Sequence, residues 1–225
     1  MTIHPIGHIH SDFPTKFGIP RQSGMVRSLR AKLVFAPPYR DANALRGLTD
    51  FSHLWLIWAF SAVESGGFSP TVRPPRLGGN VRLGVFATRS PYRPNPLGLS
   101  VVAMEAIEED PDLGPVIHLL GADLMDGTPV YDIKPYLPYA DAIPEAKGGF
   151  ADTPPGPALQ VEISEAHLAM LPPGKGAALL AVLALDPRPS YQEDANRVYG
   201  FLFGGFEVKF QVRGEVLTVI DISPA

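Results

Sequence analysis

The stretch HLWLIWAF, from His53 to Phe60, contains an unbroken apolar run in the first half of the chain. Its seven consecutive apolar residues suit a strand buried in a core, whereas a membrane-spanning helix needs roughly 20. We therefore expect no membrane-spanning segment, and we expect a fold built from short buried strands.

Prolines and glycines divide the remaining β-type runs on both sides of this stretch. The 225 residues include 25 Pro and 22 Gly, and such frequent turn-forming residues between short strands are typical of barrels and sandwiches. One short helix is expected over residues 41–48, with Asp41 as its N-cap. The strands expected in this part cover residues 3–10, 29–35, 53–60, 81–86, 99–107, 116–123 and 130–133.

The chain changes character after a polar, Gly- and Pro-rich segment at residues 146–157, which is typical of a linker. Beyond it, SEAHLAML with Ser164 as N-cap and GAALLAVLALD both favour helices. GFEVKFQVRG and EVLTVIDIS then favour a hairpin that turns at Gly214. We predict a mainly β chain: a β-barrel-type domain at residues 1–145, a linker at 146–157 and a small α+β domain at 158–225.

Charge is segregated along the chain although the net charge is only −4. Residues 13–100 carry twelve Lys/Arg and three Asp/Glu, whereas residues 101–160 carry two Lys and eleven Asp/Glu. If several cations of the basic block share one face, they would bind phosphates or carboxylates. Equally, the acidic block could neutralise them in the folded protein.

Several common kinds of site are missing from the sequence. There is no Cys, and hence no disulfide, thiolate nucleophile or Cys-based metal site. There is no G-x-G-x-x-G, no P-loop and no H-E-x-x-H motif, which argues against a Rossmann or P-loop nucleotide site. The first residues do not resemble a signal peptide, so we expect a cytoplasmic protein.

The histidines give two open interpretations. His4, His8 and His10 share one face of an expected strand, which would allow a metal, but no carboxylate accompanies them at suitable spacing. We expect edge histidines that face solvent, and no metal. His53 is expected to be a hydrogen-bonded residue of the core or of a site wall.

Four polar stretches rich in Pro and Gly suit preorganised binding walls, because proline lowers the entropy cost of holding a loop in one shape. Three contain cations and one contains Asp123, Asp126 and Asp132, so together they favour a ligand with both positive and negative groups. The stretches are FGIPRQSGMV, TVRPPRLGGNVR, GVFATRSPYRPNPLGLS and GADLMDGTPVYDIKPYLPYAD.

At these stretches the chain resembles the tRNA N6-threonylcarbamoyladenosine-37 N6-methyltransferases, the TsaA-like or YaeB-like proteins. The matching segments are PIGHIHS, KFGIPRQSG, DFSHLWLIWAF, TVRPPRLGGNVRLGVFATRSPYRPNPLGLS, DLMDGTPVYDIKPYLPYAD and LALDPRPSY. The resemblance implies a β-barrel that binds S-adenosylmethionine, methylation of the modified adenosine of tRNA, a homodimer, and contact with the anticodon stem-loop. It also accounts for the missing dinucleotide motif.

The resemblance further implies which residues contact the cofactor. At one position the family often has His-Gln, where this chain has Ser61 and Ala62. The implied cofactor-binding residues are Pro20, Arg21, Gln22, Ser61, Ala62, Arg89, Leu99, Asp123, Leu124, Met125 and Asp126.

Hypotheses for the transfer step and for the RNA follow from this assignment. Asp126 or Tyr199 would withdraw or orient the proton of the acceptor nitrogen. Two other functions stay open, a module that senses S-adenosylmethionine or another metabolite, and a small-molecule methyltransferase on the same fold. The residues expected to bind the substrate are Arg93, Asn95, Lys134, Arg188 and Tyr191.

Overall fold

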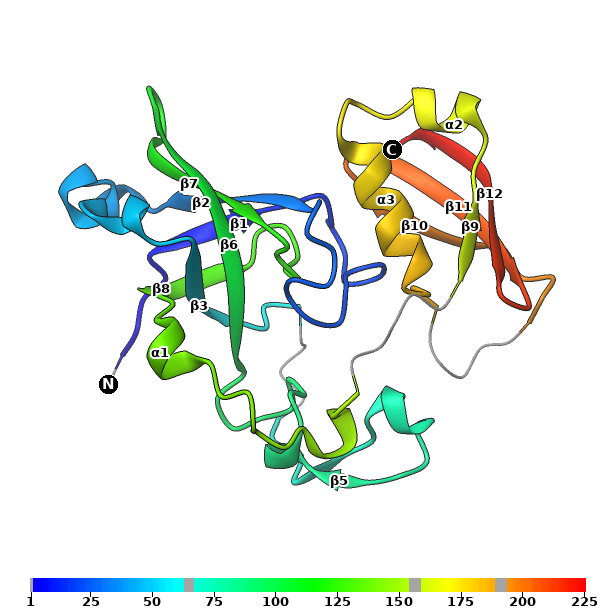
Figure 1. Ribbon diagram of the computed structural model, residues 1–225, viewed down its shortest axis with the longest axis horizontal. Coiled ribbons are helices and arrows are strands. Elements are labelled where there is room, and N and C mark those ends of the chain that lie inside the picture. The colour runs from blue at the N-terminus through cyan, green and yellow to red at the C-terminus, as the bar shows by residue number, and fades with distance from the viewer. Residues whose placement is uncertain (1, 63–66, 154–158, 189–193) are drawn as a thin grey trace.

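The protein consists of two main sheets, each packed around its own hydrophobic core. The computed structural model describes residues 2–62, 67–153, 159–188 and 194–225. In Figure 1 the sheet of residues 7–135 lies on one side, and the C-terminal sheet with its helices lies on the other. The first part of the chain is mainly β and the second is a small α+β part, which confirms the fold class predicted from the sequence.

The first sheet is a closed ring of six antiparallel strands. Around the ring, each strand is hydrogen-bonded to its two neighbours in the order β1-β2-β7-β6-β3-β8. The strands are β1 (Gly7–His10), β2 (Arg30–Phe35), β3 (His53–Ala59), β6 (Leu97–Asp110), β7 (Gly114–Leu120) and β8 (Pro129–Pro135).

Side-chain alternation fills the inside of the ring. In β3, Leu54, Leu56 and Trp58 point inward and are buried, as the two-residue period of a strand requires. His53 was predicted to be a core or wall residue, and this is wrong. It is exposed at the first position of β3, and its Nδ1 lies 2.8 Å from the hydroxyl of Ser52.

Short elements connect the strands of the ring. The helix predicted over residues 41–48 is two separate 3₁₀ turns, because Gly47 takes a left-handed conformation (φ +82°) between them. Asp41 is the predicted N-cap and accepts from the Asn43 N–H at 2.9 Å. The elements are β4 (Thr71–Val72), β5 (Leu83–Gly84), α1 (Pro138–Asp141) and 3₁₀ turns at Pro37–Tyr39, Ala42–Leu45, Leu48–Asp50, Pro75–Leu77, Val85–Ala87 and Gly149–Ala151.

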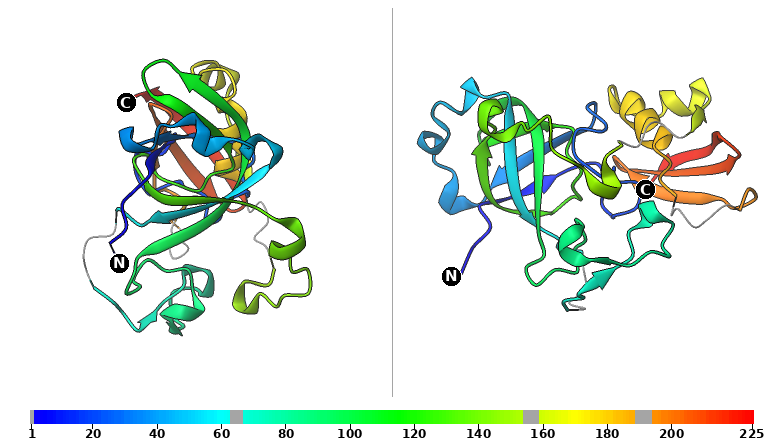
Figure 2. Two further views of the ribbon diagram at one scale, coloured as in Figure 1. Left: turned by 90° about the vertical axis from the view of Figure 1, so that its left-hand side faces the viewer. Right: turned by 60° about the horizontal axis from the view of Figure 1, so that its bottom comes forward.

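The segment that holds β4 and β5 forms a lobe (residues 67–96) that projects from one side of the ring, beside the segment that follows α1 (Figures 1 and 2). Arg76 of the lobe donates a hydrogen bond to the carbonyl of Thr153. Of the strand predicted over residues 81–86, only Leu83 and Gly84 are in a strand. The rest of the prediction is wrong, since Val85 already begins a 3₁₀ turn.

The C-terminal sheet has the order β10-β11-β12-β9, with β9 parallel to β12. Ser164 accepts from the His167 N–H at 3.1 Å, which confirms it as a helix N-cap, and Gly214 (φ +60°) forms the predicted turn. The strands β9 and β10 were not predicted. The elements are β9 (Gln160–Glu162), α2 (Glu165–Ala169), α3 (Lys175–Ala184), β10 (Tyr199–Phe203), β11 (Phe206–Arg213) and β12 (Val216–Pro224).

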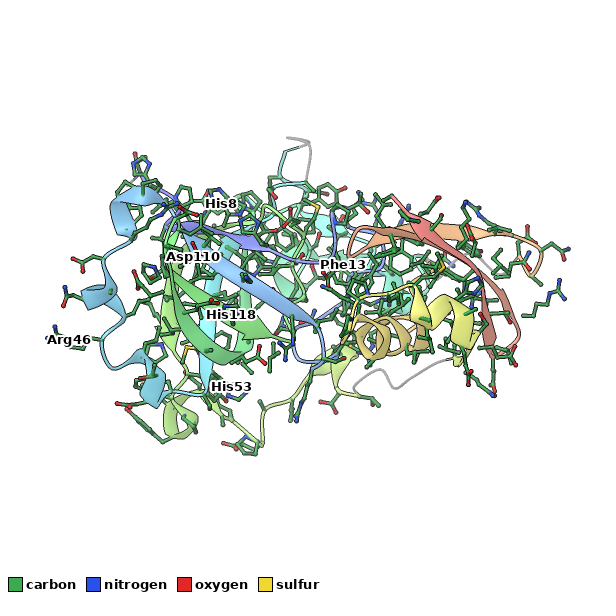
Figure 3. The ribbon with its side chains drawn as sticks, turned by 90° about the horizontal axis from the view of Figure 1, so that it is seen from above. His8, Phe13, Arg46, His53, Asp110 and His118 are labelled. Carbon is green, nitrogen blue, oxygen red and sulfur yellow. The ribbon has the colours of Figure 1, made fainter. Side chains whose placement is uncertain are left out.

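The two sheets are joined by more than the connection at residues 136–159. The N-terminal loop (residues 11–29) leaves β1 and buries Phe13, Val26 and Leu29 in the core of the C-terminal sheet. Figure 3 shows Phe13 at the place where the ring meets the C-terminal part. Within the described residues, no helix has the length and apolar character needed to cross a membrane.

Candidate active site

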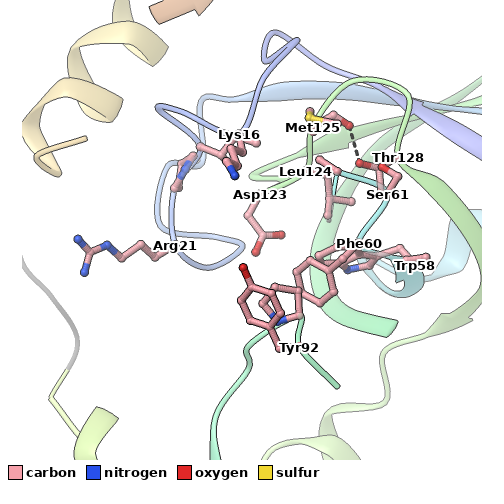
Figure 4. A pocket seen from close by; sticks show the side chains of 15 residues that line it. Lys16, Arg21, Trp58, Phe60, Ser61, Tyr92, Asp123, Leu124, Met125 and Thr128 are labelled. Atoms are coloured by element: carbon pink, nitrogen blue, oxygen red, sulfur yellow. Dashed lines mark hydrogen bonds between the residues drawn. The ribbon is translucent and has the colours of Figure 1, made fainter. Parts of the chain in front are cut away.

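A cavity of about 720 Å³ opens at one end of the ring, between the N-terminal loop, the end of β3, the lobe and the acidic loop (residues 121–128) (Figure 4). Its size falls within the roughly 300–1,000 Å³ that is usual for pockets that bind small molecules. It is lined by Lys16, Ile19, Pro20, Arg21, Trp58, Ala59, Phe60, Ser61, Ala62, Pro91, Tyr92, Asp123, Leu124, Met125 and Thr128.

Asp123 is the one acidic side chain among the described residues of this lining. The hydroxyl of Ser100 donates to Asp123 Oδ1 at 2.8 Å, and the indole N–H of Trp58 donates to the same hydroxyl at 3.1 Å. Burial raises the pKa of Asp123 above its usual value of 3.8, although hydrogen bonds from Ser100 and the Ser23 backbone and the charge of Arg89 act in the opposite direction. The carboxyl is therefore held in one orientation at a desolvated position.

The N-terminal loop brings Pro20 and Arg21 to the cavity, and the resemblance implies that both residues contact the cofactor. The N–H of Gly24 donates to the carbonyl of Gly121 at 2.8 Å, which holds this loop against the acidic loop. Gly24 has φ +76°, a conformation that other residues rarely adopt. The tight turn at this point follows from that glycine.

Gln22 and Arg89 are not in the lining, but they are brought together beside it. Arg89 Nη1 donates to Gln22 Oε1, so the lobe and the N-terminal loop meet at this pair. Ser61 and Ala62 also line the cavity at the end of β3. Leu99 lies on the outer face of β6 and is 54% exposed, so its side chain is not brought to the cavity.

The two carboxylates of the acidic loop point to different parts of the molecule. Leu124 and Met125 line the cavity next to Asp123, whereas Asp126 does not. Asp126 Oδ1 accepts from the Ser11 N–H at 3.0 Å and lies 3.6 Å from Nδ1 of His10. The structure therefore does not bring Asp126, which was hypothesised to handle the proton of the acceptor, into the cavity lining, because its carboxylate is directed at the end of β1.

Tyr199 is also outside the cavity, and its hypothesised catalytic role is corrected. It lies in β10, is 4% exposed, and stacks on Phe210 inside the core of the C-terminal sheet (ring centroids 5.5 Å apart). Its hydroxyl has no hydrogen-bond partner among the described residues. A side chain in this position cannot reach a ligand in the cavity.

The residues predicted to bind the substrate do not line the cavity either. Arg93 donates to the carbonyls of Val85 (3.2 Å) and Thr88 (2.6 Å), so it holds the lobe together. Asn95 is exposed in the same lobe.

The other three predicted substrate residues lie in β8 and in the C-terminal part of the chain. Lys134 in β8 pairs with Asp132 at 2.9 Å. Arg188 makes two bonds of 2.8 Å to Asp186 beyond α3. Tyr191 lies outside the described residues.

Sequence reasoning missed four lining residues that give the cavity much of its character. In Figure 4 the ammonium end of Lys16 and the hydroxyl of Tyr92 both point toward Asp123, while Trp58 and Phe60 form an aromatic wall on the other side. The rings of Trp58 and Phe60 contact edge to face at 4.4 Å between centroids. The available signal was the Tyr-Arg-Pro sequence of the lobe and the aromatic end of the apolar strand.

The lining matches the chemistry of S-adenosylmethionine. A flat purine suits the wall of Trp58 and Phe60, and an amine or ribose hydroxyls suit the fixed carboxyl of Asp123. A carboxylate suits Arg21 at the rim. Among the described residues, no His, Asp and Glu side chains cluster in a way that would hold a metal ion.

Comparisons with known proteins extend over both parts of the chain. Residues 8–142 match the family model of the tRNA-methyltransferase O N-terminal domain, and residues 157–225 match that of the TrmO C-terminal domain. The tRNA (adenine(37)-N6)-methyltransferase of Escherichia coli K12 is 42% identical over 97% of this chain and 96% of its own.

Proteins of Pseudomonas aeruginosa are similar in sequence and in structure. One, described as an S-adenosylmethionine-dependent methyltransferase, is 42% identical over 99% of this chain and 97% of its own. The crystal structure of TrmO from that organism superposes with a TM-score of 0.81 at 37% identity and covers 100% of this chain and 97% of its own. The ring, the C-terminal sheet and their order are thus shared.

Proposed function

The chain belongs to the tRNA-methyltransferase O family, and from this membership we propose that it transfers the methyl group of S-adenosylmethionine to N6 of adenosine 37 in tRNA. The observation that carries the proposal is the cavity, where an oriented carboxyl, cations and an aromatic wall converge from segments far apart in the chain. Full-length similarity to a tRNA (adenine(37)-N6)-methyltransferase supports the assignment of the acceptor.

When bound, S-adenosylmethionine would supply a methyl group on a positively charged sulfur: N6 would attack the methyl carbon in line, the carbon–sulfur bond would break to leave S-adenosylhomocysteine, and N6 would lose its proton to bulk solvent. The task of the protein is to hold both reactants in that alignment and to exclude water. We assign the purine to Trp58 and Phe60, the amine or ribose hydroxyls to Asp123, and the carboxylate to Arg21 and Arg89. Because Ser100 fixes the carboxyl of Asp123, this hydrogen-bond acceptor is already oriented before the cofactor binds.

We extend the proposal to the substrate. The acceptor is N6-threonylcarbamoyladenosine, whose carboxylate would meet Lys16 and Tyr92 of the cavity lining. These two residues replace Arg93 and Asn95 in our assignment, since Arg93 is engaged by the backbone of the lobe. The exposed arginines of the lobe, Arg73 and Arg82, suit the phosphates of the anticodon stem-loop.

We also propose the division of the chain and its assembly. Residues 1–145 form the methyltransferase domain, 146–157 the linker and 158–225 the C-terminal domain, in line with the two matched ranges. A homodimer would cover Phe68 and Phe86, which stack at 6.4 Å and are 53% and 71% exposed on the lobe. We expect a cytoplasmic enzyme, because its substrate is tRNA.

Nucleoside mass spectrometry tests the activity directly. Purified protein and S-adenosylmethionine are incubated with threonylcarbamoylated tRNA or with the same tRNA lacking that modification. We expect a mass increase of one methyl group on the modified nucleoside only. Methylation of the unmodified adenosine would overturn the substrate class.

Two further outcomes distinguish the alternative functions. Binding of S-adenosylmethionine without methylation of either tRNA would overturn the tRNA methyltransferase and favour a sensor of the cofactor. Affinity for tRNA should fall steeply with salt, because several phosphates are neutralised on binding. A flat salt response would favour a small-molecule methyltransferase.

A further inference from the structure

The N-terminal loop, which brings Pro20 and Arg21 to the cavity, is held at both of its ends by the C-terminal domain. Phe13 precedes the cavity residues and is 1% exposed, while Val26 and Leu29 follow them and are each 3% exposed. All three belong to the core of the C-terminal sheet rather than to the interior of the ring. The apolar side chains of the loop are therefore packed on the C-terminal domain, while its backbone at Phe13, Gly24 and Leu29 is hydrogen-bonded to the acidic loop of the ring.

Aromatic contacts continue this packing up to the cavity itself. Phe13 meets Phe203 edge to face at 5.4 Å between centroids, and Phe17 meets Phe201 at 6.1 Å. Gly18 has φ +90°, and a Cβ placed on it would lie 2.5 Å from the ring of Phe201. Only two residues separate this contact from Arg21.

A polar clamp lies at the start of the same loop. Asp12 is ion-paired with Lys175 of α3, and their side chains are 11% and 30% exposed. The N–H of Gly204 donates to the carbonyl of Asp12 at 2.8 Å, so backbone and side chain both bind the C-terminal domain. A charge-assisted contact that is this sheltered fixes position better than an exposed pair does.

We propose that the C-terminal domain positions the cofactor-binding loop, with Asp12, Phe13 and Gly18 as positioning residues that act through Lys175, Phe203 and Phe201. The inference rests on the proposed function in that the ligand held by the loop is S-adenosylmethionine. It assigns the domain a role in cofactor affinity that differs from gripping RNA. By linkage, a tRNA contact that shifts the domain changes the affinity for the cofactor, and the cofactor changes the affinity for tRNA by the same factor.

A charge-swap cycle on the full-length protein tests the clamp. We compare Asp12→Lys, Lys175→Asp and the double variant by calorimetric titration with S-adenosylmethionine and by tRNA binding. Each single variant should weaken cofactor binding by about tenfold, and the double variant should recover most of it. Binding of tRNA should stay within about twofold in all three, since the charges are directed at each other. Lys209→Asp, on the same domain but paired with Glu207 and Asp221, is the matched control and should change neither affinity.

A glycine pair provides a second test that does not depend on the clamp. Gly18→Ala forces a side chain against Phe201, whereas Gly24→Ala places one in open space on the same loop with the same kind of backbone conformation (φ +76°). Gly18→Ala should therefore weaken cofactor binding clearly more than Gly24→Ala does. Equal effects of the two variants, or single charge variants that bind the cofactor as the wild type does, would overturn the proposal.

Amide hydrogen exchange without cofactor separates this proposal from the proposed function. In both single charge variants, amides of residues 14–24 should exchange faster than in the wild type, and the double variant should restore protection. If the wild type fails to bind S-adenosylmethionine, the proposed function is wrong while the exchange data still decide the positioning role. A uniform gain in exchange across the ring as well would indicate general destabilisation and would contradict it.

Discussion

Ser100 Oγ donates a hydrogen bond of 2.8 Å to Oδ1 of Asp123, joining the middle of the barrel wall to the acidic loop. Ser100 is 3% exposed and lies in β6, opposite Leu56 of β3. The indole N–H of Trp58 donates to the same hydroxyl. An inward-pointing serine thus orients a carboxyl that the acidic loop alone would leave free to rotate.

Replacing Ser100 with Ala should weaken binding of S-adenosylmethionine by about tenfold and lower the free energy of unfolding by about 1–2 kcal/mol, because Asp123 and the Trp58 indole both lose a partner. Calorimetric titration and urea denaturation measure the two effects. In the unfolding measurement Trp58→Phe is the control, since it removes the indole donor but keeps the bond between Ser100 and Asp123. Wild-type affinity in Ser100→Ala would show that Asp123 needs no orientation.

The pH dependence of stability should reveal the buried carboxyl. Because the pKa of Asp123 is raised in the folded state, its ionised form costs stability at neutral pH, and the cost disappears as pH falls through the raised pKa to below its usual value of 3.8. Asp123→Asn should therefore be more stable than the wild type at pH 7, with the difference closing on acidification. Urea denaturation from pH 3.5 to pH 8 measures it, and a variant less stable than the wild type at pH 7 would contradict the assignment.

The two carboxylates of the acidic loop should behave differently in turnover. Asp123→Asn should raise the KM for S-adenosylmethionine at least tenfold, because it removes the charge that faces the cofactor. Asp126→Asn should stay within about threefold of wild-type kcat/KM, since an amide oxygen can still accept from the Ser11 N–H. Steady-state methyl transfer to tRNA compares them, and the opposite order would return the proton-handling role to Asp126.

The aromatic wall depends on a glycine opposite it in the sheet. Gly98 is paired with Trp58, and a Cβ at Gly98 would overlap the indole ring. Gly98→Ala should displace Trp58, lower the free energy of unfolding by about 1–3 kcal/mol and weaken cofactor binding. Gly84→Ala is the control, because its backbone conformation (φ −59°) suits alanine and the added group meets nothing within 4 Å. Equal stability of the two variants would show that the wall tolerates displacement.

Local patterns in the sequence identified most of the elements and the loops of the site. The apolar alternation around Leu54 and Leu56 marks a strand wherever it is placed, and Ser164 caps a helix through a bond three residues away. The motif around Pro20 and Arg21 and the loop around Asp123 were found for the same reason, because each is a continuous stretch. The resemblance to the family then supplied the cofactor.

Tertiary structure decided which side of each loop faces the cavity. Asp123 and Asp126 are three residues apart, and only the closure of the ring turns the first toward Ser100 and the second toward Ser11. Arg93 was predicted to bind the substrate, and in the structure its Nη1 donates to two carbonyls of its own lobe. The burial of Phe13 in the core of the C-terminal sheet also cannot be read from the sequence. A sequence determines what forms within one helix, strand or turn, while contacts between elements, whether 23 residues apart as in Ser100–Asp123 or 115 apart as in Ser11–Asp126, depend on how the sheets close.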